Sequence, residues 1–236
     1  MGICHLVNGC LFEFGENCRI RRESEMIIRN EKTDDYRVVE EMIKKTFWNL
    51  SVPGCNEHYF AHLVRNSEDF IPELDFVLEE DGKIIGHIIY VNAKLVAMDG
   101  TEKEILSFGP FTIHPDYQRK GYGRKLLEHS LEAARKLGFD TIAIWGNPEN
   151  YACYGFKNCK RYNVCIDEDV YPVALMVKVL DEDALDGKMW KYVESPAHEM
   201  DESGFDEFDS SFEQMEEGYK YTQELFYIYS KSNVLR

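Results

Sequence analysis

The spacing of apolar and polar residues predicts a chain of short strands and amphipathic helices. Runs of apolar residues at 74–78, 83–91, 103–113 and 141–145 have the length and β-branched content of strands. Asp81-Gly82 and Asp99-Gly100 separate three of these runs, and Asp-Gly between apolar runs is a strong hairpin signal. The pattern therefore predicts three antiparallel strands before residue 114, the middle one continuing over 93–96 past a bulge.

Helices are predicted on both sides of these strands. Thr33-Asp34-Asp35 is typical of a helix start, and the helix behind it turns Tyr36, Val39, Met42, Ile43 and Phe47 inward. A second helix is expected at 57–65. A third, over 124–137, ends at Gly138, the usual left-handed stop. Its inward face is predicted to be Leu126, Leu127, Ser130, Leu131, Ala134 and Leu137.

Further strands are expected at 26–30, 162–166 and 173–179, the last two joined by the acidic turn at 167–169. The total is about seven strands and about four helices. Most neighbours should run antiparallel, with one parallel step around the third helix. The predicted class is therefore α+β, with a mixed, mostly antiparallel central sheet.

The turn Gln118-Arg-Lys-Gly-Tyr-Gly123, between a strand and a helix, has the makings of an anion site. The first N–H groups of a helix have no partner within it, and the helix dipole is positive there. Gly121 and Gly123 allow close approach of a ligand, and Arg119 and Lys120 add charge. A phosphate or pyrophosphate is the expected occupant. The turn lacks the Lys-Ser/Thr of a P-loop, and Leu126 replaces the last glycine of the dinucleotide fingerprint.

Two motifs resemble the GCN5-related N-acetyltransferase (GNAT) family. Gln118–Gly123 resembles that family's Q/R-x-x-G-x-G/A turn, which holds the pyrophosphate of acetyl-CoA. Downstream, strand 141–145 is followed by Gly-Asn-Pro-Glu-Asn-Tyr151 and then Gly155-Phe156, which resembles the family's fifth strand and its short fourth helix. The resemblance covers residues 26–179 and looks most like a subgroup of predicted bacterial N-acetyltransferases.

The resemblance implies a set of site residues. A bulge at Gly109-Pro110 would let the backbone of the following strand pair with the pantetheine arm. Tyr151 would protonate the departing thiolate, and Asn147 would either bond the pantetheine or cap a helix. The implied pantetheine contacts are Phe111, Thr112 and Ile113, and the implied pyrophosphate contacts are Gln118, Arg119, Lys120, Gly121, Tyr122, Gly123 and Arg124.

The function implied by the resemblance is transfer of an acetyl group from acetyl-CoA to a primary amine, directly in a ternary complex. The acceptor, a small-molecule or protein amine, is not identified. The base is not named either; Glu104 and Glu57 are weak candidates. Glu57 and His58 border the expected acceptor region, or are simply a helix-start Glu and a surface His. The alternative function is a non-catalytic acyl-CoA-binding sensor or regulatory module.

Composition narrows the class of partner. The net charge of −16 argues against nucleic-acid binding, which needs a basic face. It favours solubility, or attraction of a cationic amine. The seven cysteines contain no Cys-x-x-Cys pair, so neither a disulfide framework nor a metal site is expected. No apolar run has transmembrane length and no signal peptide is indicated, so we expect a cytoplasmic protein that does not bind membranes.

Three segments are predicted. Residues 1–25 form an N-terminal extension, produced by a mis-assigned start or folded as a hairpin, and 26–180 form the acetyltransferase domain. Residues 181–236 form an acidic C-terminal extension that contains many aromatic residues. Between 181 and 217 it has 14 acidic residues against two lysines, with phenylalanines at near-helical spacing. We expect one short strand at 191–194, and packing of the aromatic end on the domain or on a second subunit in a homodimer.

Overall fold

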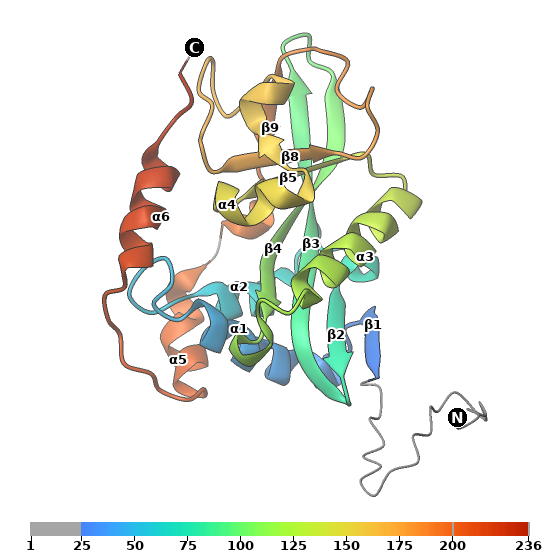
Figure 1. The fold of residues 1–236 in the computed structure, drawn as a ribbon. Coiled ribbons are helices and arrows are strands. Elements are labelled where there is room, and N and C mark those ends of the chain that lie inside the picture. The colour runs from blue at the N-terminus through green and yellow to red at the C-terminus, as the bar shows by residue number, and fades with distance from the viewer. Residues whose placement is uncertain (1–24, 200, 236) are drawn as a thin grey trace, which may run out of the picture.

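The protein is an α+β structure built on one nine-stranded sheet (Figure 1). The computed structural model describes residues 25–199 and 201–235. The strands are β1 (Met26–Asn30), β2 (Phe76–Glu80), β3 (Lys83–Ala97), β4 (Glu102–Ile113), β5 (Thr141–Trp145), β6 (Lys157–Asn158), β7 (Val164–Cys165), β8 (Leu175–Val179) and β9 (Trp190–Val193). The helices are α1 (Tyr36–Phe47), α2 (Glu57–Val64), α3 (Tyr122–Lys136), α4 (Pro148–Tyr151), α5 (Phe205–Ser210) and α6 (Tyr221–Lys231).

The predicted fold class is confirmed, and so is the pattern of strand pairing. The strands follow the order β1-β2-β3-β4-β5-β8-β6, and only β4–β5 and β7–β9 pair in parallel. The described residues hold more strands than the expected total of about seven, because β6 and β7 have two residues each and leave no periodic signal. The predicted turn does follow β7, but β7 pairs with β9 and not with β8.

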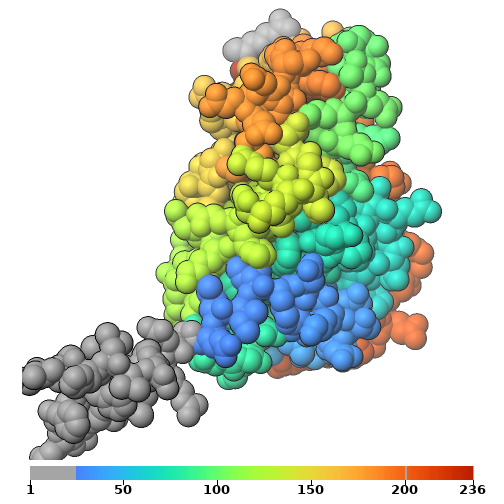
Figure 2. All heavy atoms as spheres, turned by 90° about the vertical axis from the view of Figure 1, so that its right-hand side faces the viewer, coloured from blue at the N-terminus to red at the C-terminus, as the bar shows by residue number. Residues whose placement is uncertain are grey.

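Helix α3 covers one face of the sheet and encloses the larger core. Leu126, Leu127, Ser130 and Ala134 are fully buried, as their spacing predicts. The Ser130 and Tyr90 hydroxyls lie 2.8 Å apart and satisfy each other inside this core. Leu137 was predicted wrongly, because it is 48% exposed: the helix ends at Lys136, beyond its last turn against the sheet. Figure 2 shows α3, in yellow-green, across the middle of this face, above β1 in blue.

Helices α1 and α2 pack on the opposite face of the lower sheet. Val39 and Ile43 of α1 meet Ala61 of α2 and Val77 of β2 in a small core of their own. The predicted helix boundaries are confirmed to within a residue or two. Because both helices lie on the face away from α3, the sheet separates them from the glycine turn at the start of α3 (Figure 1).

The sheet continues past residue 180, where we placed the end of the domain. Strand β9, expected near 191–194, pairs antiparallel with Lys94–Ala97 of β3. Further on, α5 packs against α2, and the Phe208 ring lies 5.1 Å from Tyr59 and 5.6 Å from His58 between centroids. His58 is fully buried by these contacts, so it is not the surface residue that we considered.

Some predictions reach beyond what the structure describes. The proposed N-terminal extension at 1–25 lies, apart from Glu25, outside the described residues. Tyr219, Tyr221 and Tyr227 are 62–74% exposed, and the homodimer stays a prediction. Among the helices within 25–199 and 201–235, none is long and apolar enough to cross a membrane.

Candidate active site

The turn from Gln118 to Gly123 leaves its polar groups open to a ligand. Arg119 and Gly121 both adopt left-handed backbone angles, with φ of 62° and 88°. Gly121 is also the N-cap of α3, and a Cβ placed on it would meet no atom within 4 Å. The left-handed pair curls the chain so that successive N–H groups point into one concavity, the arrangement that binds anions.

Side chains of the turn bond the backbone that precedes it, and leave the turn's own N–H groups unpaired. The Gln118 side chain donates from Nε2 to the Ile113 carbonyl at 2.9 Å, and Lys120 donates from Nζ to the Asp116 carbonyl at 2.8 Å. Within the part of the chain that the structure describes, no protein group accepts from the backbone N–H groups of residues 119–124. Unpaired donors at a helix start with nearby cations are the parts of a pyrophosphate site.

Of the remaining turn residues, some pack against the domain and others present charge to solvent. The Tyr122 phenol donates to Glu80 of β2, and that carboxylate raises the pKa of Tyr122 to about 12. The Arg124 guanidinium lies 5.6 Å from the centre of the Tyr154 ring. A Cβ on Gly123 would only touch Ile113 and Phe111, at 3.5 Å. Tyr122 and Gly123 therefore support the turn, while Arg119, Lys120 and Arg124 present charge at the surface.

Strands β4 and β5 run parallel but separate almost at once. They pair only at Leu106 and Ile142. Opposite β3, β4 carries two residues, Gly109 and Pro110, where β3 has only Ile89, so the predicted bulge is confirmed. The bulge bends β4, and the strands part beyond Leu106, toward the end nearest the glycine turn.

The backbone beyond the bulge presents one free edge. His114 donates its N–H to Ile85 of β3, so the alternation of an antiparallel pair turns Thr112 toward β3 as well. The same alternation turns the backbone groups of Phe111 and Ile113 toward the side that β5 has left. Thr112 is fully buried, whereas Phe111 and Ile113 are half-buried beside the start of α3.

Tyr151 lies where the two strands part, on the α3 face. Its ring is 5.9 Å from Phe108 of β4 and 5.8 Å from Phe156. It lies so close to Gly146, just past β5, that a Cβ there would come within 2.4 Å of the ring. Burial, with smaller effects of Tyr229 and Tyr154, raises the pKa of the phenol above its usual 10. Tyr151 is therefore a protonated phenol at neutral pH.

Other candidates have ordinary structural partners. Asn147 is the cap of α4, and its Oδ1 accepts from the Glu149 N–H at 3.0 Å. The Glu57 carboxylate accepts from the Asn56 N–H at 3.2 Å at the start of α2. His58 bonds Asp209 through Nε2 at 2.9 Å. Glu104 is exposed on β4, before the strands part.

One group outside the turn has donor atoms close enough for a metal ion. Glu31, Asp75 and His87 each offer an atom within 4.8 Å of the others. Arg65, however, donates to both Glu31 oxygens at 2.8 and 2.9 Å. Burial lowers the pKa of His87, but Asp75 and Glu31 raise it by more, to about 9. The imidazolium and the Arg65 guanidinium pair with the two carboxylates, so this group forms a buried ion-pair network.

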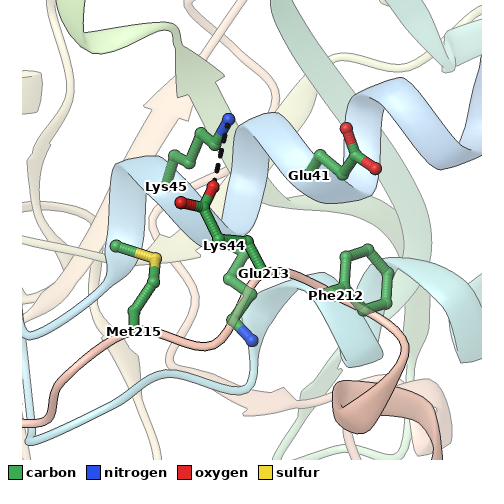
Figure 3. Close-up of a pocket in the computed structure, with 6 residues that line it drawn as sticks. All are labelled: Glu41, Lys44, Lys45, Phe212, Glu213 and Met215. Atoms are coloured by element: carbon green, nitrogen blue, oxygen red, sulfur yellow. Dashed lines mark ion pairs between the residues drawn. The ribbon is translucent and has the colours of Figure 1, made fainter.

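Two hollows in the described residues lie away from this site. One of about 150 Å³ is lined by residues of α1 and of the segment after α5, including Lys44, Phe212 and Met215 (Figure 3). Another, of about 400 Å³, lies between the end of α2 and residues 196–201 and includes Glu68, Asp69, Glu199 and Asp201. Neither hollow includes Tyr151 or the glycine turn. The candidate site therefore rests on the turn, the edge of β4 and Tyr151, which meet where β4 and β5 part.

Sequence reasoning missed one cluster beside this parting. Ser107, Trp145 and Tyr192 meet on the face away from α3, with Glu194 and His198 next to them. They come from β4, β5 and the segment after residue 180. The run Lys191-Tyr-Val-Glu194 predicted a short strand there but carried no sign of its partner in the sheet.

Comparison with known proteins supports the same family. Residues 41–156 match the acetyltransferase (GNAT) family. The uncharacterized N-acetyltransferase YjhQ of Escherichia coli is 32% identical over 89 residues, which are 37% of this chain and 48% of YjhQ. The chain thus spans about half of that relative. The uncharacterized N-acetyltransferase YhbS of Escherichia coli is 23% identical, over 69% of this chain and 92% of YhbS.

Solved structures agree on the fold. The GNAT family N-acetyltransferase YhbS from Escherichia coli, in complex with CoA, superposes with a TM-score of 0.65 at 17% identity over 77% of this chain and 96% of its own. A GNAT family acetyltransferase from Brucella melitensis, in complex with acetyl-CoA, has a TM-score of 0.57 at 21% identity over 74% of this chain and 98% of its own. The motifs, the sheet and these matches lead to one conclusion: residues 41–156 belong to the acetyltransferase (GNAT) family.

Proposed function

We propose that the protein transfers an acetyl group from acetyl-CoA to a primary amine, directly, in a ternary complex. The observation that carries the proposal is the pairing of two features on the α3 face. A glycine turn with unpaired N–H groups lies at the start of α3, and the Tyr151 phenol lies where β4 and β5 part. The turn can bind the pyrophosphate of coenzyme A, and the phenol can protonate the thiolate that forms when the acetyl group leaves the sulfur.

Binding would begin at the turn. The N–H groups from Arg119 to Arg124 would donate to the pyrophosphate, and the positive end of the α3 dipole would add to their attraction. Arg119 and Lys120 would supply full charges in charge-assisted contacts. Gln118 would position the turn, because its side chain donates to the Ile113 carbonyl at the end of β4.

The pantetheine arm would lie against the free edge of β4. The backbone groups of Phe111 and the N–H of Ile113 face the space that β5 leaves, so an extended arm can pair there as an added strand, while Gln118 occupies the Ile113 carbonyl. A backbone N–H of β4 at the parting would polarise the thioester carbonyl and stabilise the oxyanion that forms on attack. Asn147, already a helix cap through its Oδ1, has its amide nitrogen left to donate to the arm.

Tyr151 would complete the reaction by protonating the coenzyme A thiolate. Its raised pKa keeps the proton on the phenol until the sulfur leaves. The acceptor amine would enter from the face opposite α3. The net charge of −16, and the four carboxylates in the hollow beside residues 196–201, favour an acceptor that carries positive charge.

Calorimetry with acetyl-CoA tests the site directly. Gly121→Glu puts a side chain at φ of 88° and a negative charge into the anion site, so micromolar binding should fall by about 100-fold or more. Gly138→Glu is the matched control. Gly138 has φ of 94° and the same open surroundings, but lies at the other end of α3. Equal losses in both variants would trace the effect to the backbone and contradict a phosphate site at the turn.

A screen of amines with detection of the free thiol then separates the enzyme from the alternative function. An enzyme releases coenzyme A in step with acetylated amine. A sensor module binds acetyl-CoA at the same turn but releases no thiol with any amine. Binding that is absent from the unaltered protein would overturn both functions.

A further inference from the structure

Strand β9 brings Tyr192 over the place where β4 and β5 part. The Tyr192 ring lies 6.4 Å from the Trp145 ring at the end of β5, centroid to centroid. Its hydroxyl lies beside Ser107, the first residue of β4 after the one pair with β5. Tyr192 therefore spans the opening between the two strands.

Tyr192 and Tyr151 lie on opposite faces of the sheet. Ser107 and Phe108 are consecutive in β4, so their side chains point to opposite faces. Phe108 contacts Tyr151 and Ser107 contacts Tyr192. A thioester held between the strands would therefore have the Tyr151 phenol on one face and the Tyr192 phenol on the other.

The Tyr192 hydroxyl is a buried polar group without a satisfactory partner. Tyr192 is 5% exposed, and among the described residues its hydroxyl makes no hydrogen bond of normal geometry, even with the adjacent Ser107. Buried hydroxyl groups nearly always have a partner in a native structure. A buried hydroxyl left unpaired where β4 and β5 part has a hydrogen bond left to give to a ligand.

Glu194 adds a carboxylate to the same face. It lies two residues beyond Tyr192, so the alternation of an extended chain points both side chains the same way. Its side chain is 41% exposed, and its Oε1 lies 3.8 Å from Nδ1 of His198, whose ring stacks on Phe60 of α2. Burial raises the pKa of Glu194, and the charge of His198 and a hydrogen bond from Trp145 oppose this only in part. A carboxylate with a raised pKa is a better base near neutral pH.

We propose that β9 builds the acceptor side of the active site, where Tyr192 orients the amine and Glu194 takes its proton. This inference rests on the proposed acetyl transfer and names the base that the sequence did not. Both groups come from the segment after residue 180, outside the stretch at 41–156 that matches the family. The acceptor class is a primary amine that arrives as an ammonium ion.

The proton balance is complete. The ammonium nitrogen passes one proton to the Glu194 carboxylate, which its exposure lets it return to solvent. The neutral nitrogen attacks the thioester carbon, and a C–N bond forms. As the C–S bond breaks, the sulfur takes a proton from Tyr151, and the second proton of the nitrogen restores the phenol. The products are the amide, coenzyme A and one released proton.

The test uses the full chain with acetyl-CoA and three probe amines, spermidine, L-lysine and tyramine. Glu194→Gln should lower kcat/KM for the best probe by about tenfold or more, and should remove the acidic limb of its pH profile. Tyr192→Phe should raise KM with a smaller effect on kcat. Glu182→Gln, the same change at an exposed carboxylate of the same C-terminal segment, is the control. Acetyl-CoA affinity should stay within about twofold in all three, because these groups lie across the sheet from the turn.

The outcomes are distinguishable. Normal turnover and an intact acidic limb in Glu194→Gln, with transfer by the unaltered protein, would overturn the inference and leave the proposed function standing. Acetyl-CoA binding by the unaltered protein without transfer to any of the three amines would overturn both and favour the sensor. Thermal unfolding of each variant, compared with Glu182→Gln, separates a lost base from a lost fold.

Discussion

Two charged regions of this protein differ in how far the chain satisfies them. At the turn before α3, the backbone N–H groups of residues 119–124 have no protein acceptor among the described residues, and the Arg119 side chain is exposed. At the contact between α5 and the α1–α2 pair, the charged groups at the centre are paired with one another. Asp209 accepts from Lys44 at 2.6 Å and pairs with His58 at 2.9 Å, and both of these side chains are at most 3% exposed.

The difference separates a binding site from a scaffold. Buried charges are stable only when they are paired, so the Asp209 cluster fixes the C-terminal segment in place. The unpaired N–H groups of the exposed turn have no acceptor in the free protein. A bound anion supplies those acceptors. This contrast predicts that changes at the Asp209 cluster act on stability, and changes at the turn before α3 act on affinity or rate.

The largest effect should follow Asp209→Ala. The change leaves the Lys44 ammonium buried and unpaired, and loss of one partner of a buried pair costs about 3–5 kcal/mol of unfolding free energy. Denaturant unfolding measures it. The control is Glu213→Ala, which removes the exposed partner of Lys45 at 3.8 Å (Figure 3) and should cost at most about 0.5 kcal/mol. Similar costs for the two variants would refute the contrast.

The buried ion-pair network around His87 should make stability depend on pH. His87 has a pKa of about 9 in the folded protein and about 6.5 unfolded. A raised pKa means that its stabilisation is present in full below pH 6.5 and is lost as pH rises to 9. The loss is on the order of 3 kcal/mol, because each pKa unit is worth 1.36 kcal/mol.

Denaturant unfolding at pH 6.5 and at pH 9 measures this loss, and His87→Gln should remove most of it. Glu31, Asp75 and His58, at about 2, about 6 and about 4, titrate below the window. Burial raises the pKa of the Cys55, Cys159 and Cys165 thiols, so stability also falls as pH passes the unfolded thiol value of about 8.5, but it does so equally in the variant. A slope as steep in the variant as in the unaltered protein would exclude His87 as its source.

Tyr151→Phe should act on rate alone. Removal of the proposed proton donor should lower turnover by about tenfold or more. A tenfold loss raises the barrier by about 1.4 kcal/mol. Acetyl-CoA affinity should hold, because the ring keeps its contacts with Phe108 and Phe156. Tyr154→Phe is the control for a neighbouring phenol. Turnover that falls equally in both variants would remove Tyr151 from the acid role.

The same contrast explains which parts of the molecule the sequence could predict. The glycine turn, the start of α3 and the bulge at Gly109-Pro110 are local, because a few adjacent residues determine them through helix capping and backbone angles. Their residue types are therefore enough. The resemblance to a known family then supplied the roles of Tyr151 and of the turn.

The parts that escaped prediction depend on distant partners. Lys44 and Asp209 are 165 residues apart, and nothing near either residue indicates that they meet. His58 could not be told from a surface residue until the phenylalanines of α5 were placed over it. Tyr192 and Glu194 were a short predicted strand, and only the pairing of β9 with β3 brings them to the parting of β4 and β5.

The smallest effect should follow Arg119→Gln, which tests the open side of the contrast. The Arg119 side chain is exposed, and the described residues offer it no ion-pair partner, so its charge is available to a phosphate. An exposed charge contact is worth about 0.2–1 kcal/mol, so the Kd for acetyl-CoA should rise by about twofold to fivefold. The rise should shrink as salt is added, since ions screen exposed charges. Lys125→Gln, a cation that instead lies 3.6 Å from the Met26 sulfur, should leave Kd unchanged. Equal changes for the two would mean that only the overall charge of this surface matters, and that the turn itself recognises the phosphate through its backbone.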